Sequence, residues 1–376
     1  MLQKTEILII GGGIAGCIAA ISLAEKYQVT IVDKLYHPID RVGESLAPAC
    51  QRILKKLRIL QNEPEEVTQQ LYTHNLGMQS YWGSDNVQFV DHLRNPDGPS
   101  KSLHRKNFES YLRKLTAERK VKSFWGYKLH HSVYNENSWE VTIKSDDKTT
   151  QHTQTVSAKF VIDATGRNSH FARSLGIKRV HFDKLISCWI SLPNNEVNNM
   201  STIVSEKLGW WYSAVTPHKK RIVSFQTDPD LVNRTTFKNK ENFLQLIKTN
   251  SIIKQLIPSV PLESINFHGT VSANSTRLQT VAGKQWIALG DAAISFDPLS
   301  SQGMFNAMAC AMQVKILLDK FDFIKQKSPE LNDAFTREYK QQISSIWKHY
   351  LKHKNIFYNV EKRWKDAPFW TRRQQA

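Results

Sequence analysis

A short run of residues near the amino terminus has the types and spacing of a phosphate-binding turn. Residues 11–16 read GGGIAG and follow an apolar stretch, residues 6–10, that is typical of a buried strand. The first glycine would permit a tight turn, the third would let the backbone approach a pyrophosphate, and the last would let a helix pack closely on a sheet. The amides that open this helix would face the phosphates with the positive end of its dipole. The residues assigned to this dinucleotide turn are Gly11, Gly13, Ile14, Ala15 and Gly16.

A second strand and an acidic residue complete the pattern. Residues 29–32 are apolar, and Asp33 follows them where a carboxylate can accept hydrogen bonds from both hydroxyl groups of an adenosine ribose. Lys34 is assigned to the same site. Strand, glycines, helix, strand and acid in this order predict a βαβ unit. The unit occurs once, so we do not expect a second permanent site for NAD(P)H, and electrons would come from a transiently docked nicotinamide or another reductant.

Three later segments have residues suited to the rest of such a cofactor. Residues 41–45 read RVGES, a short loop in which a cation and a hydroxyl could meet the cofactor chain. Residues 161–169 read VIDATGRNS, a strand that leads into a tight turn. Residues 287–303 read IALGDAAISFDPLSSQG, a strand and an acid followed by a loop that enters an apolar helix. The candidate residues in these segments are Arg41, Glu44, Ser45, Thr165, Gly166, Gly290 and Asp291.

Composition limits the class of protein. The 376 residues carry 51 Lys and Arg against 34 Asp and Glu, a formal net charge of +17. This charge suits either a solvated basic surface or attraction to an acidic protein, an anionic lipid or nucleic acid. No nucleic-acid-binding motif is present, although residues 340–373 are rich in bases and aromatics. The four cysteines lie far apart, which predicts neither disulfides nor a metal site. No apolar run approaches the ~20 residues of a membrane span, and no signal peptide is evident. We expect a cytoplasmic protein.

Together, the glycine turn and the three later segments resemble the FAD-binding segments of group A flavin monooxygenases and, more closely, of the tryptophan halogenase superfamily. The resemblance implies bound FAD, with Glu44 and Ser45 beside the flavin and Asp291 on the ribityl hydroxyls. It also implies that Arg105, in HRKNFESYL, contacts the cofactor chain. The loop PLSSQG would lie against the flavin ring, where a helix dipole stabilises negative charge. Its implied cofactor residues are Pro298, Ser301, Gln302, Gly303 and Met304.

The sequence departs from the halogenase pattern at its catalytic positions. Halogenases of this superfamily have a lysine in a TFKLGI-like strand and a glutamate in the loop PLESTG. Here Asn75 stands at the lysine position and Ser300 at the glutamate position. Residues 209–217 read GWWYSAVTP in place of the signature WxWxIP. The resemblance therefore implies hydroxylation of an electron-rich ring rather than chlorination.

The carboxyl-terminal residues narrow the implied substrate. Residues 358–373, YNVEKRWKDAPFWTRR, resemble the ending of flavoproteins that oxygenate a tryptophan inside an amino-acid oxidase during formation of cysteine tryptophylquinone. The closest resemblance is to the maturases of glycine oxidase and lysine oxidase. The implied partners are the acidic precursor of an amino-acid oxidase and an electron donor such as NAD(P)H or a separate reductase. A small-molecule aromatic hydroxylase, an isoprenoid-lipid reductase and a non-catalytic flavin-binding chaperone of an oxidase precursor are the alternatives.

Substrate-binding and catalytic side chains are less sharply indicated. The central segment reads as antiparallel strands, and we expect Trp210, Trp211 and Tyr212 to line a substrate cleft. The weak candidates for a general base are Glu44, His74 and His104.

The expected fold class is α/β, a Rossmann-type FAD-binding domain with a second β-sheet substrate domain and a helical carboxyl terminus. The predicted ranges are 1–78, 103–180 and 273–325 for the FAD-binding domain, 79–102 and 181–272 for the substrate domain, and 326–376 for the helical segment.

Overall fold

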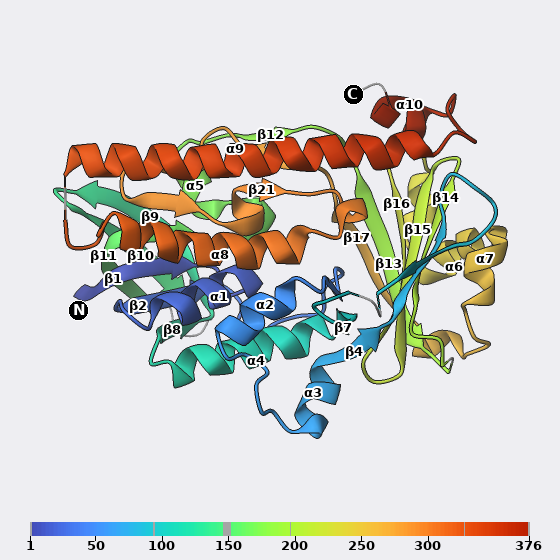
Figure 1. Cartoon of the computed structure of the whole chain (residues 1–376), viewed down its shortest axis with the longest axis horizontal. Coiled ribbons are helices and arrows are strands. Elements are labelled where there is room, and N and C mark those ends of the chain that lie inside the picture. The colour runs from blue at the N-terminus through green and yellow to red at the C-terminus, as the bar shows by residue number, and fades with distance from the viewer. Residues whose placement is uncertain (1, 93–94, 146–151, 196, 327, 375–376) are drawn as a thin grey trace.

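The computed structural model describes residues 2–92, 95–145, 152–195, 197–326 and 328–374. It forms an elongated molecule in which a helix-covered sheet occupies one end and a second sheet the other (Figure 1). A long helix near the carboxyl terminus joins the two ends. The predicted α/β fold class is confirmed.

The first sheet has eight strands and contains the βαβ unit. Its central path runs β19-β20-β11-β1-β2-β8, with β10 and β9 added beside β11. The central strand β1 pairs in parallel with β2 and with β11. Its apolar residues 7–10 are buried because helices and further strands cover both of its faces. The strands are β1 (Leu2–Ile10), β2 (Val29–Asp33), β8 (Lys122–Trp125), β9 (Tyr127–Asn135), β10 (Ser138–Ser145), β11 (Thr153–Asp163), β19 (Ala282–Gly283) and β20 (Trp286–Ala288).

The helices around this sheet pack on one another through small residues. Helix α1 contacts both α8 and α4. Its Ala19 and Ala20 are fully buried, which lets the neighbouring helices approach closely. The helices are α1 (Ile14–Leu23), α2 (Cys50–Lys56), α3 (Glu65–Leu71), α4 (Arg105–Glu118), α5 (His170–Ser174) and α8 (Gly303–Lys320).

The second sheet has seven strands in the order β17-β13-β16-β15-β14-β5-β6. Its outer face packs on α6 (Lys240–Thr249) and α7 (Ser251–Gln255) through Phe243, Ile247 and Ile253. Its inner face, on the side of the first sheet, packs on the carboxyl-terminal segment through Trp210. The strands are β5 (Gly77–Tyr81), β6 (Gln88–Asp91), β13 (Ile186–Pro193), β14 (Ser201–Glu206), β15 (Gly209–Thr216), β16 (Lys220–Thr227) and β17 (Asn266–Ser272).

The fold also contains two small sheets of three strands each. One has the order β3-β7-β4 and the other β12-β18-β21. Their strands are β3 (Ser45–Leu46), β4 (Tyr72–Asn75), β7 (Ser100–Leu103), β12 (Arg179–His181), β18 (Thr276–Leu278) and β21 (Ile294–Ser295). Short 3-10 helices are η1 (Gly166–Asn168), η2 (Arg234–Phe237), η3 (Leu262–Ser264), η4 (Gly290–Ala292) and η5 (Pro298–Ser300).

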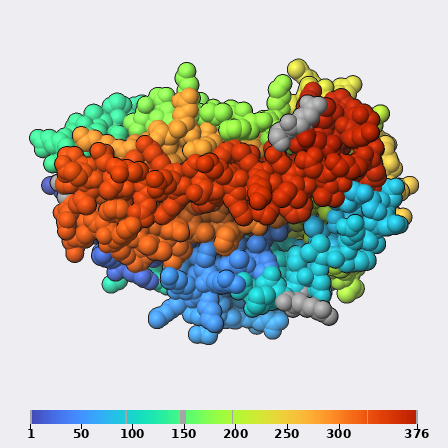
Figure 2. Space-filling model, turned by 45° about the horizontal axis from the view of Figure 1, so that its top comes forward, coloured from blue at the N-terminus to red at the C-terminus, as the bar shows by residue number. Residues whose placement is uncertain are grey.

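The carboxyl-terminal segment forms α9 (Pro329–Val360) and α10 (Pro368–Gln374), as the sequence predicts. It crosses one whole face of the molecule (Figure 2). The buried Tyr339 and Trp347 of α9 pack into the core of the first sheet, and Tyr358 packs into the inner cluster of the second. Arg373 of α10 forms a buried ion pair with Asp228 at 2.5 Å. The segment therefore holds the two cores together.

The domain boundaries remain a prediction. All eight strands of the first sheet come from the three ranges assigned to the FAD-binding domain, whereas β5, which begins at residue 77, belongs to the second sheet. No helix among the described residues is long and apolar enough to cross a membrane. The four cysteines are buried and carry free thiols.

Candidate active site

Steric contact explains two of the three motif glycines, and the third borders open space. A Cβ at Gly11, where φ is +114°, would lie 2.2 Å from the carbonyl oxygen of Ala164. A Cβ at Gly16 would lie 1.8 Å from the carbonyl oxygen of Gly11. At Gly13, by contrast, no atom from another part of the described chain lies within 4 Å of the Cβ position, and its φ of −84° suits any residue. The space beside Gly13 is what a pyrophosphate requires, so the turn fits the predicted cofactor.

Two helices present uncapped amino termini at this open space. Helix α1 has no side-chain cap and no acid in its first turn, and the same is true of α8. Their first amides, among them those of Ile14, Ala15, Gly303 and Met304, have no acceptor within the helix and suit anionic groups. The two helices pack on each other, and Gly290 lies between them, its Cβ position 3.2 Å from the Ala15 Cβ. Three segments that are far apart in sequence, namely the start of α1, Gly290 and the start of α8, thus lie side by side. We call the region that they border the cofactor strip.

Asp33 holds the nucleotide turn from the end of β2. Its Oδ2 accepts a hydrogen bond from the Gly12 amide at 2.6 Å. Arg113, which sequence reasoning missed, contacts Asp33 Oδ1 at 3.1 Å and donates to the Gly12 carbonyl at 3.1 Å. The Arg113 guanidinium also lies 4.2 Å from the ring centre of Trp125. Lys34 is exposed. Arg113 lies eight residues beyond Arg105 on α4, and this helical spacing is the signal that could have found it.

The Arg105 guanidinium is fixed by hydrogen bonds from Nη1 and Nη2, whereas its Nε has no partner among the described residues. Its Nη1 donates to the Gly43 carbonyl at 2.6 Å, and its Nη2 donates to the buried Glu109 carboxylate at 2.6 Å. Its Nε is buried and has no partner among the residues that the structure describes. An oriented guanidinium with an unused donor fits an acceptor outside the protein chain, such as an oxygen of the cofactor.

Glu44 is the acidic group at the boundary between the two sheets. It is buried, and its Oε2 accepts a hydrogen bond from the Gly43 amide at 3.1 Å. Burial raises the pKa of Glu44, although nearby amides and the charge of Arg105 oppose the shift. The Tyr212 hydroxyl on β15 lies beside this carboxylate and beside Ser45. Burial and the Glu44 charge raise the Tyr212 pKa well above its ordinary value. Ser45 is partly exposed next to this pair.

The turn after β11 is fixed by a buried carboxylate. Asp163 Oδ1 accepts from the Thr165 hydroxyl at 2.6 Å and from the Thr165 amide at 3.0 Å, and Oδ2 accepts from the Ala172 amide at 2.9 Å. Burial raises the pKa of Asp163. Gly166 follows in the left-handed region with φ of +66°. These bonds hold Thr165 and Gly166 next to Gly11.

Two further arginines that sequence reasoning missed position Asp291. Arg179 donates to the carbonyl oxygens of Asp291 and Ala292, each at 2.7 Å. Burial lowers the pKa of Arg179 to about 10, an effect that the charge of Asp291 opposes. Arg167 Nε lies 3.7 Å from Asp291 Oδ2. The Asp291 side chain remains 40% exposed, so its carboxylate is open to a ligand's hydroxyl groups.

At the two positions where halogenases have the lysine and the glutamate, the side chains of this protein form hydrogen bonds with the backbone. Asn75 is buried, and its Oδ1 accepts a hydrogen bond from the Gly77 amide at 3.1 Å. The Ser300 hydroxyl donates to the Asp297 carbonyl at 2.9 Å. In the same loop, Pro298 and Gln302 are exposed, and Ser301 adopts φ of +49°.

Of the three candidates for a general base, the structure brings one to the site. His74 is exposed on β4 opposite Lys101, and partial burial and the Lys101 charge lower its pKa. His104 caps α4 by accepting from the Asn107 amide at 3.3 Å, and burial lowers its pKa. Glu44 is buried between Gly43 and Tyr212, beside the assigned cofactor residue Arg105. Arg41 is exposed in the preceding loop.

The expected substrate cleft needs a correction at two residues. Trp210 and Trp211 are 2% and 0% exposed, so neither lines an open cleft. Successive residues of a strand point to opposite faces. Trp211 packs in the outer cluster with Phe243, and Trp210 packs in the inner cluster with Tyr358. Tyr212 faces inward and its ring is partly exposed.

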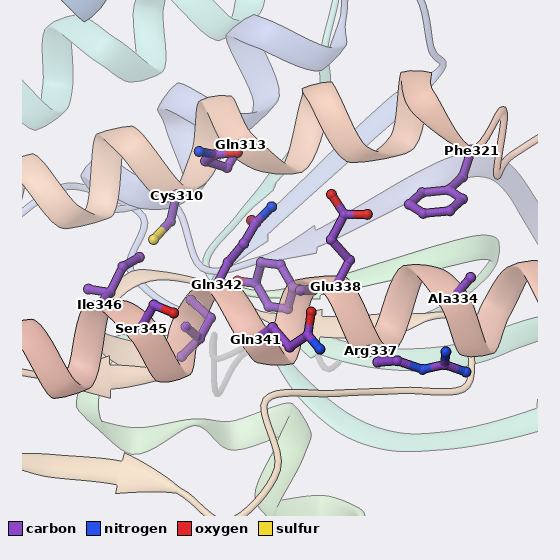
Figure 3. Close-up of a pocket in the computed structure, with 12 residues that line it drawn as sticks. Cys310, Gln313, Phe321, Ala334, Arg337, Glu338, Gln341, Gln342, Ser345 and Ile346 are labelled. Carbon is purple, nitrogen blue, oxygen red and sulfur yellow. The ribbon is translucent and has the colours of Figure 1, made fainter.

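A surface hollow of about 710 Å³ lies elsewhere, between α8 and α9 (Figure 3). Gln342 and Glu338 of α9 and Gln313 of α8 line it. Glu338 is already paired with Lys320 at 2.6 Å. The hollow has none of the glycines or uncapped helix ends described above, so we assign the active site to the strip between the two sheets.

Comparisons with known proteins identify the family and the fold of the chain. Residues 4–348 match the model of the FAD-binding domain family. LodB of Marinomonas mediterranea, described as an FAD-dependent oxidoreductase, is 27% identical over 381 residues, which cover 99% of this chain and 97% of LodB. The flavin-dependent halogenase CmlS superposes with a TM-score of 0.80 at 20% identity, covering 99% of this chain and 68% of CmlS. The peptidyl tryptophan dihydroxylase QhpG, essential for tryptophylquinone cofactor biogenesis, superposes with a TM-score of 0.79 at 20% identity, covering 99% of this chain and 79% of QhpG.

The superfamily that the sequence resembles is therefore confirmed, as is the cofactor. The chain belongs to the FAD-binding domain family and is an FAD-dependent oxidoreductase with the fold of the halogenase-like flavin monooxygenases.

Proposed function

We propose that this protein is a monooxygenase that hydroxylates a tryptophan side chain of a partner protein during cysteine tryptophylquinone biogenesis in an amino-acid oxidase, with glycine oxidase as the expected partner. One observation carries the proposal. The chain follows the peptidyl tryptophan dihydroxylase QhpG over 99% of its length, while Asn75 and Ser300 stand at the halogenase catalytic positions and bond to backbone.

Each group of site residues would have its own role in such a reaction. Bound FAD, once reduced, would supply the two electrons that, with two protons, convert dioxygen into one oxygen atom inserted into a ring C–H bond and one molecule of water. Gly13 and the amino terminus of α1 would hold the pyrophosphate, and Asp291 would hold the ribityl chain. The α8 amino terminus would stabilise negative charge at the ring. Glu44, buried with a raised pKa, can hold a proton at its carboxylate beside Tyr212.

The charge of the chain supports a protein substrate. A net charge of +17 would steer an acidic precursor toward the site. The electron donor would be NAD(P)H or a separate reductase, because the chain has one dinucleotide motif. The free thiols of all four cysteines suit a cytoplasmic site of action.

Co-expression with the precursor of the proposed partner, a glycine oxidase, tests the function. Mass spectrometry of the oxidase should find added oxygen on one tryptophan, and the oxidase should become active. Asp291→Ala, which removes the carboxylate from the strip, should leave that tryptophan unmodified. Asp333→Ala is the matched control, because Asp333 is exposed near the start of α9.

Two experimental outcomes would contradict the proposed function and favour one of the alternatives. Rapid turnover of a free aromatic acid, with the partner's tryptophan untouched, would make the protein a small-molecule hydroxylase. Maturation that survives Asp291→Ala and loss of FAD would make it a flavin-binding chaperone. Free tryptophan should be a poor substrate, because the surrounding protein surface supplies most of the binding energy that orients the ring.

A further inference from the structure

The solvent-facing side of α9 carries two adjacent rows of residues, and Figure 2 shows this helix crossing one side of the molecule. Side chains four residues apart lie next to each other along a helix. The first row contains Arg337, Gln341, Ser345, His349, His353 and Phe357. The second row contains Lys340, Ser344, Lys348, Lys352, Ile356 and Val360. All of these residues are exposed except Ser344, which is partly exposed. We call the two rows the α9 face.

Cations and no acids occupy most of the length of the α9 face. Residues 339–360 contain no Asp or Glu. No acid of the described chain forms an ion pair with any of the exposed cations, which are Arg337, Lys340, Lys348 and Lys352. Lys348 and Lys352 are one turn apart, so their charges repel each other where a Glu and Lys pair would stabilise the helix. This charge pattern is unfavourable for the isolated chain and suits an acidic surface that lies against it.

The start of the α9 face borders the hollow between α8 and α9 (Figure 3). Its lining includes Arg337, Gln341 and Ser345 of the first row, together with Gln313 of α8 and Gln342 of α9. The hollow has a volume of about 710 Å³, which is large enough for a side chain of another protein. The three glutamine amides have no hydrogen-bond partner within the described chain. Because each amide offers both donors and an acceptor, the hollow fits polar groups of a polypeptide.

The other end of the α9 face is apolar. Ile356, Phe357 and Val360 are each 50% exposed. Trp82 Nε1 donates to the Phe357 carbonyl at 2.8 Å, which fixes this turn of the helix. Exposed apolar residues that lie together are typical of interaction sites. The surface thus changes from cationic to apolar along about 35 Å of helix, which fits a partner with an acidic surface and an apolar contact at one end.

The opposite side of α9 holds the DPLSSQG loop, residues 297–303. The Tyr350 hydroxyl accepts a hydrogen bond from the Asp297 amide at 2.9 Å, and the Tyr358 hydroxyl donates to the Asp297 carboxylate at 2.8 Å. Pro298 and Gln302 of this loop are exposed. A partner on the α9 face would lie about one helix diameter, roughly 10 Å, from the loop. An extended segment of that partner could therefore reach the cofactor strip.

We propose that the α9 face is the surface on which the acidic oxidase precursor docks. This inference rests on the proposed function and names the surface that recruits its substrate. A second copy of this chain does not fit, because two cationic faces repel each other. An anionic membrane fits less well, because the apolar residues stand at one end of α9 rather than along its length, and such a helix cannot bury an apolar side in lipid.

Charge reversal at this surface tests the docking. Surface plasmon resonance measures binding of the FAD-loaded protein to the unmodified precursor of a glycine oxidase. In about 50 mM salt, Lys348→Glu combined with Lys352→Glu should weaken binding by about tenfold. Lys248→Glu combined with Lys254→Glu is the matched control, because it reverses two exposed lysines on α6 and α7 and changes the net charge equally. The control should weaken binding by about twofold at most. Circular dichroism checks that both variants fold.

A second variant separates the apolar contact from the charges. Phe357→Ala should weaken binding by about fivefold at both 50 and 300 mM salt, because salt does not screen an apolar contact. The effect of reversing Lys348 and Lys352 should instead shrink at about 300 mM salt, where charges are screened. If the lysine variant failed to fold, unchanged binding by Phe357→Ala would by itself decide against the inference.

Equal weakening by the two lysine pairs would overturn the inference, because net charge alone predicts that result. It would also be overturned if the unmodified protein did not bind the precursor, or bound phosphatidylserine vesicles or duplex DNA more tightly. The proposed function fails separately: a precursor that binds through the α9 face but gains no oxygen on its tryptophan leaves the docking surface standing. Oxygenation at an unchanged rate by the variant with Lys348 and Lys352 reversed, at subsaturating precursor, would contradict the docking alone.

Discussion

The Tyr358 hydroxyl on α9 donates a hydrogen bond to Asp297 Oδ2 at 2.8 Å, and both residues are fully buried. Asp297 begins the DPLSSQG loop, and its Oδ1 accepts from the Leu299 amide at 2.9 Å within that loop. The same hydroxyl accepts from Trp210 Nε1 at 3.3 Å. One side chain of the carboxyl-terminal segment thus connects the loop before α8 to the inner face of the seven-stranded sheet.

Tyr358→Phe should loosen this loop while preserving the fold. The change leaves the Asp297 carboxylate one donor short and should destabilise the protein by about 1–3 kcal/mol. Because the loop leads into the α8 amino terminus, FAD affinity should fall as well. Thermal unfolding and FAD titration measure the two effects. Tyr134→Phe, on the edge strand β9, should change neither, and unaltered FAD binding by Tyr358→Phe would contradict the link.

Gly13→Val should abolish FAD retention and leave the protein folded. The Cβ position of Gly13 meets no atom from another part of the described chain within 4 Å, so the added side chain would occupy the space that a pyrophosphate needs. Absorbance of the purified variant reports the flavin, and circular dichroism reports the fold. Gly16→Val is the contrast, since its Cβ would collide with the Gly11 carbonyl and should disrupt folding itself. A Gly13→Val protein with full yellow absorbance would refute the assignment.

Halide should not be incorporated into tryptophan. The Asn75 and Ser300 side chains form hydrogen bonds with the backbone, and neither is a lysine or a glutamate. Reduced protein supplied with oxygen, bromide and free tryptophan should give no more bromotryptophan than a sample without protein. Mass spectrometry decides the matter, and a clear excess of brominated product would restore the halogenase interpretation.

Association with the acidic oxidase precursor should weaken as salt rises. Between about 50 and 300 mM salt the Debye length falls from roughly 14 to 6 Å, which screens a surface charge of this kind. We expect the dissociation constant to rise by about tenfold over that range, measured by surface plasmon resonance. The association rate should carry most of the change. Affinity that stays constant across the range would show that the +17 charge does not recruit the partner.

Glu361 should make the attachment of the carboxyl-terminal segment sensitive to acid. Although burial raises its pKa, hydrogen bonds from Arg363, Ser205 and the Gly83 amide outweigh burial and lower the pKa from 4.5 to about 2. The unfolded chain therefore binds more protons than the folded chain between these values. The stabilisation is fully present above the unfolded pKa and is lost as the pH falls toward 2.

Glu361→Gln should accordingly cost about 3 kcal/mol at pH 7 and much less at pH 3. Urea unfolding of both proteins at the two pH values gives the difference directly. Asp366→Asn, which changes an exposed acid in the same segment, should show no such dependence. A cost that is the same at pH 7 and pH 3 would mean that the Glu361 charge contributes nothing.

The sequence by itself determined the features that depend on adjacent residues. The glycine turn could be predicted because backbone conformation and close approach at Gly11 and Gly16 restrict those positions to glycine within one short segment. The strand before the turn and the acid after the next strand follow from apolar patterning of contiguous residues. The same locality made the long terminal helix predictable, and the order of these segments pointed to the superfamily.

Only the tertiary structure decided which distant side chains meet. Arg179 and Asp291 are 112 residues apart, and nothing local to either one indicates their contact. The adjacent Trp210 and Trp211 looked like one aromatic group in the sequence, yet the alternation of a strand sends them into different cores. Gln226 is an unremarkable polar residue until strand pairing buries it between two serines. Its burial follows from long-range register, which, rather than local propensity, determines which polar groups are removed from water.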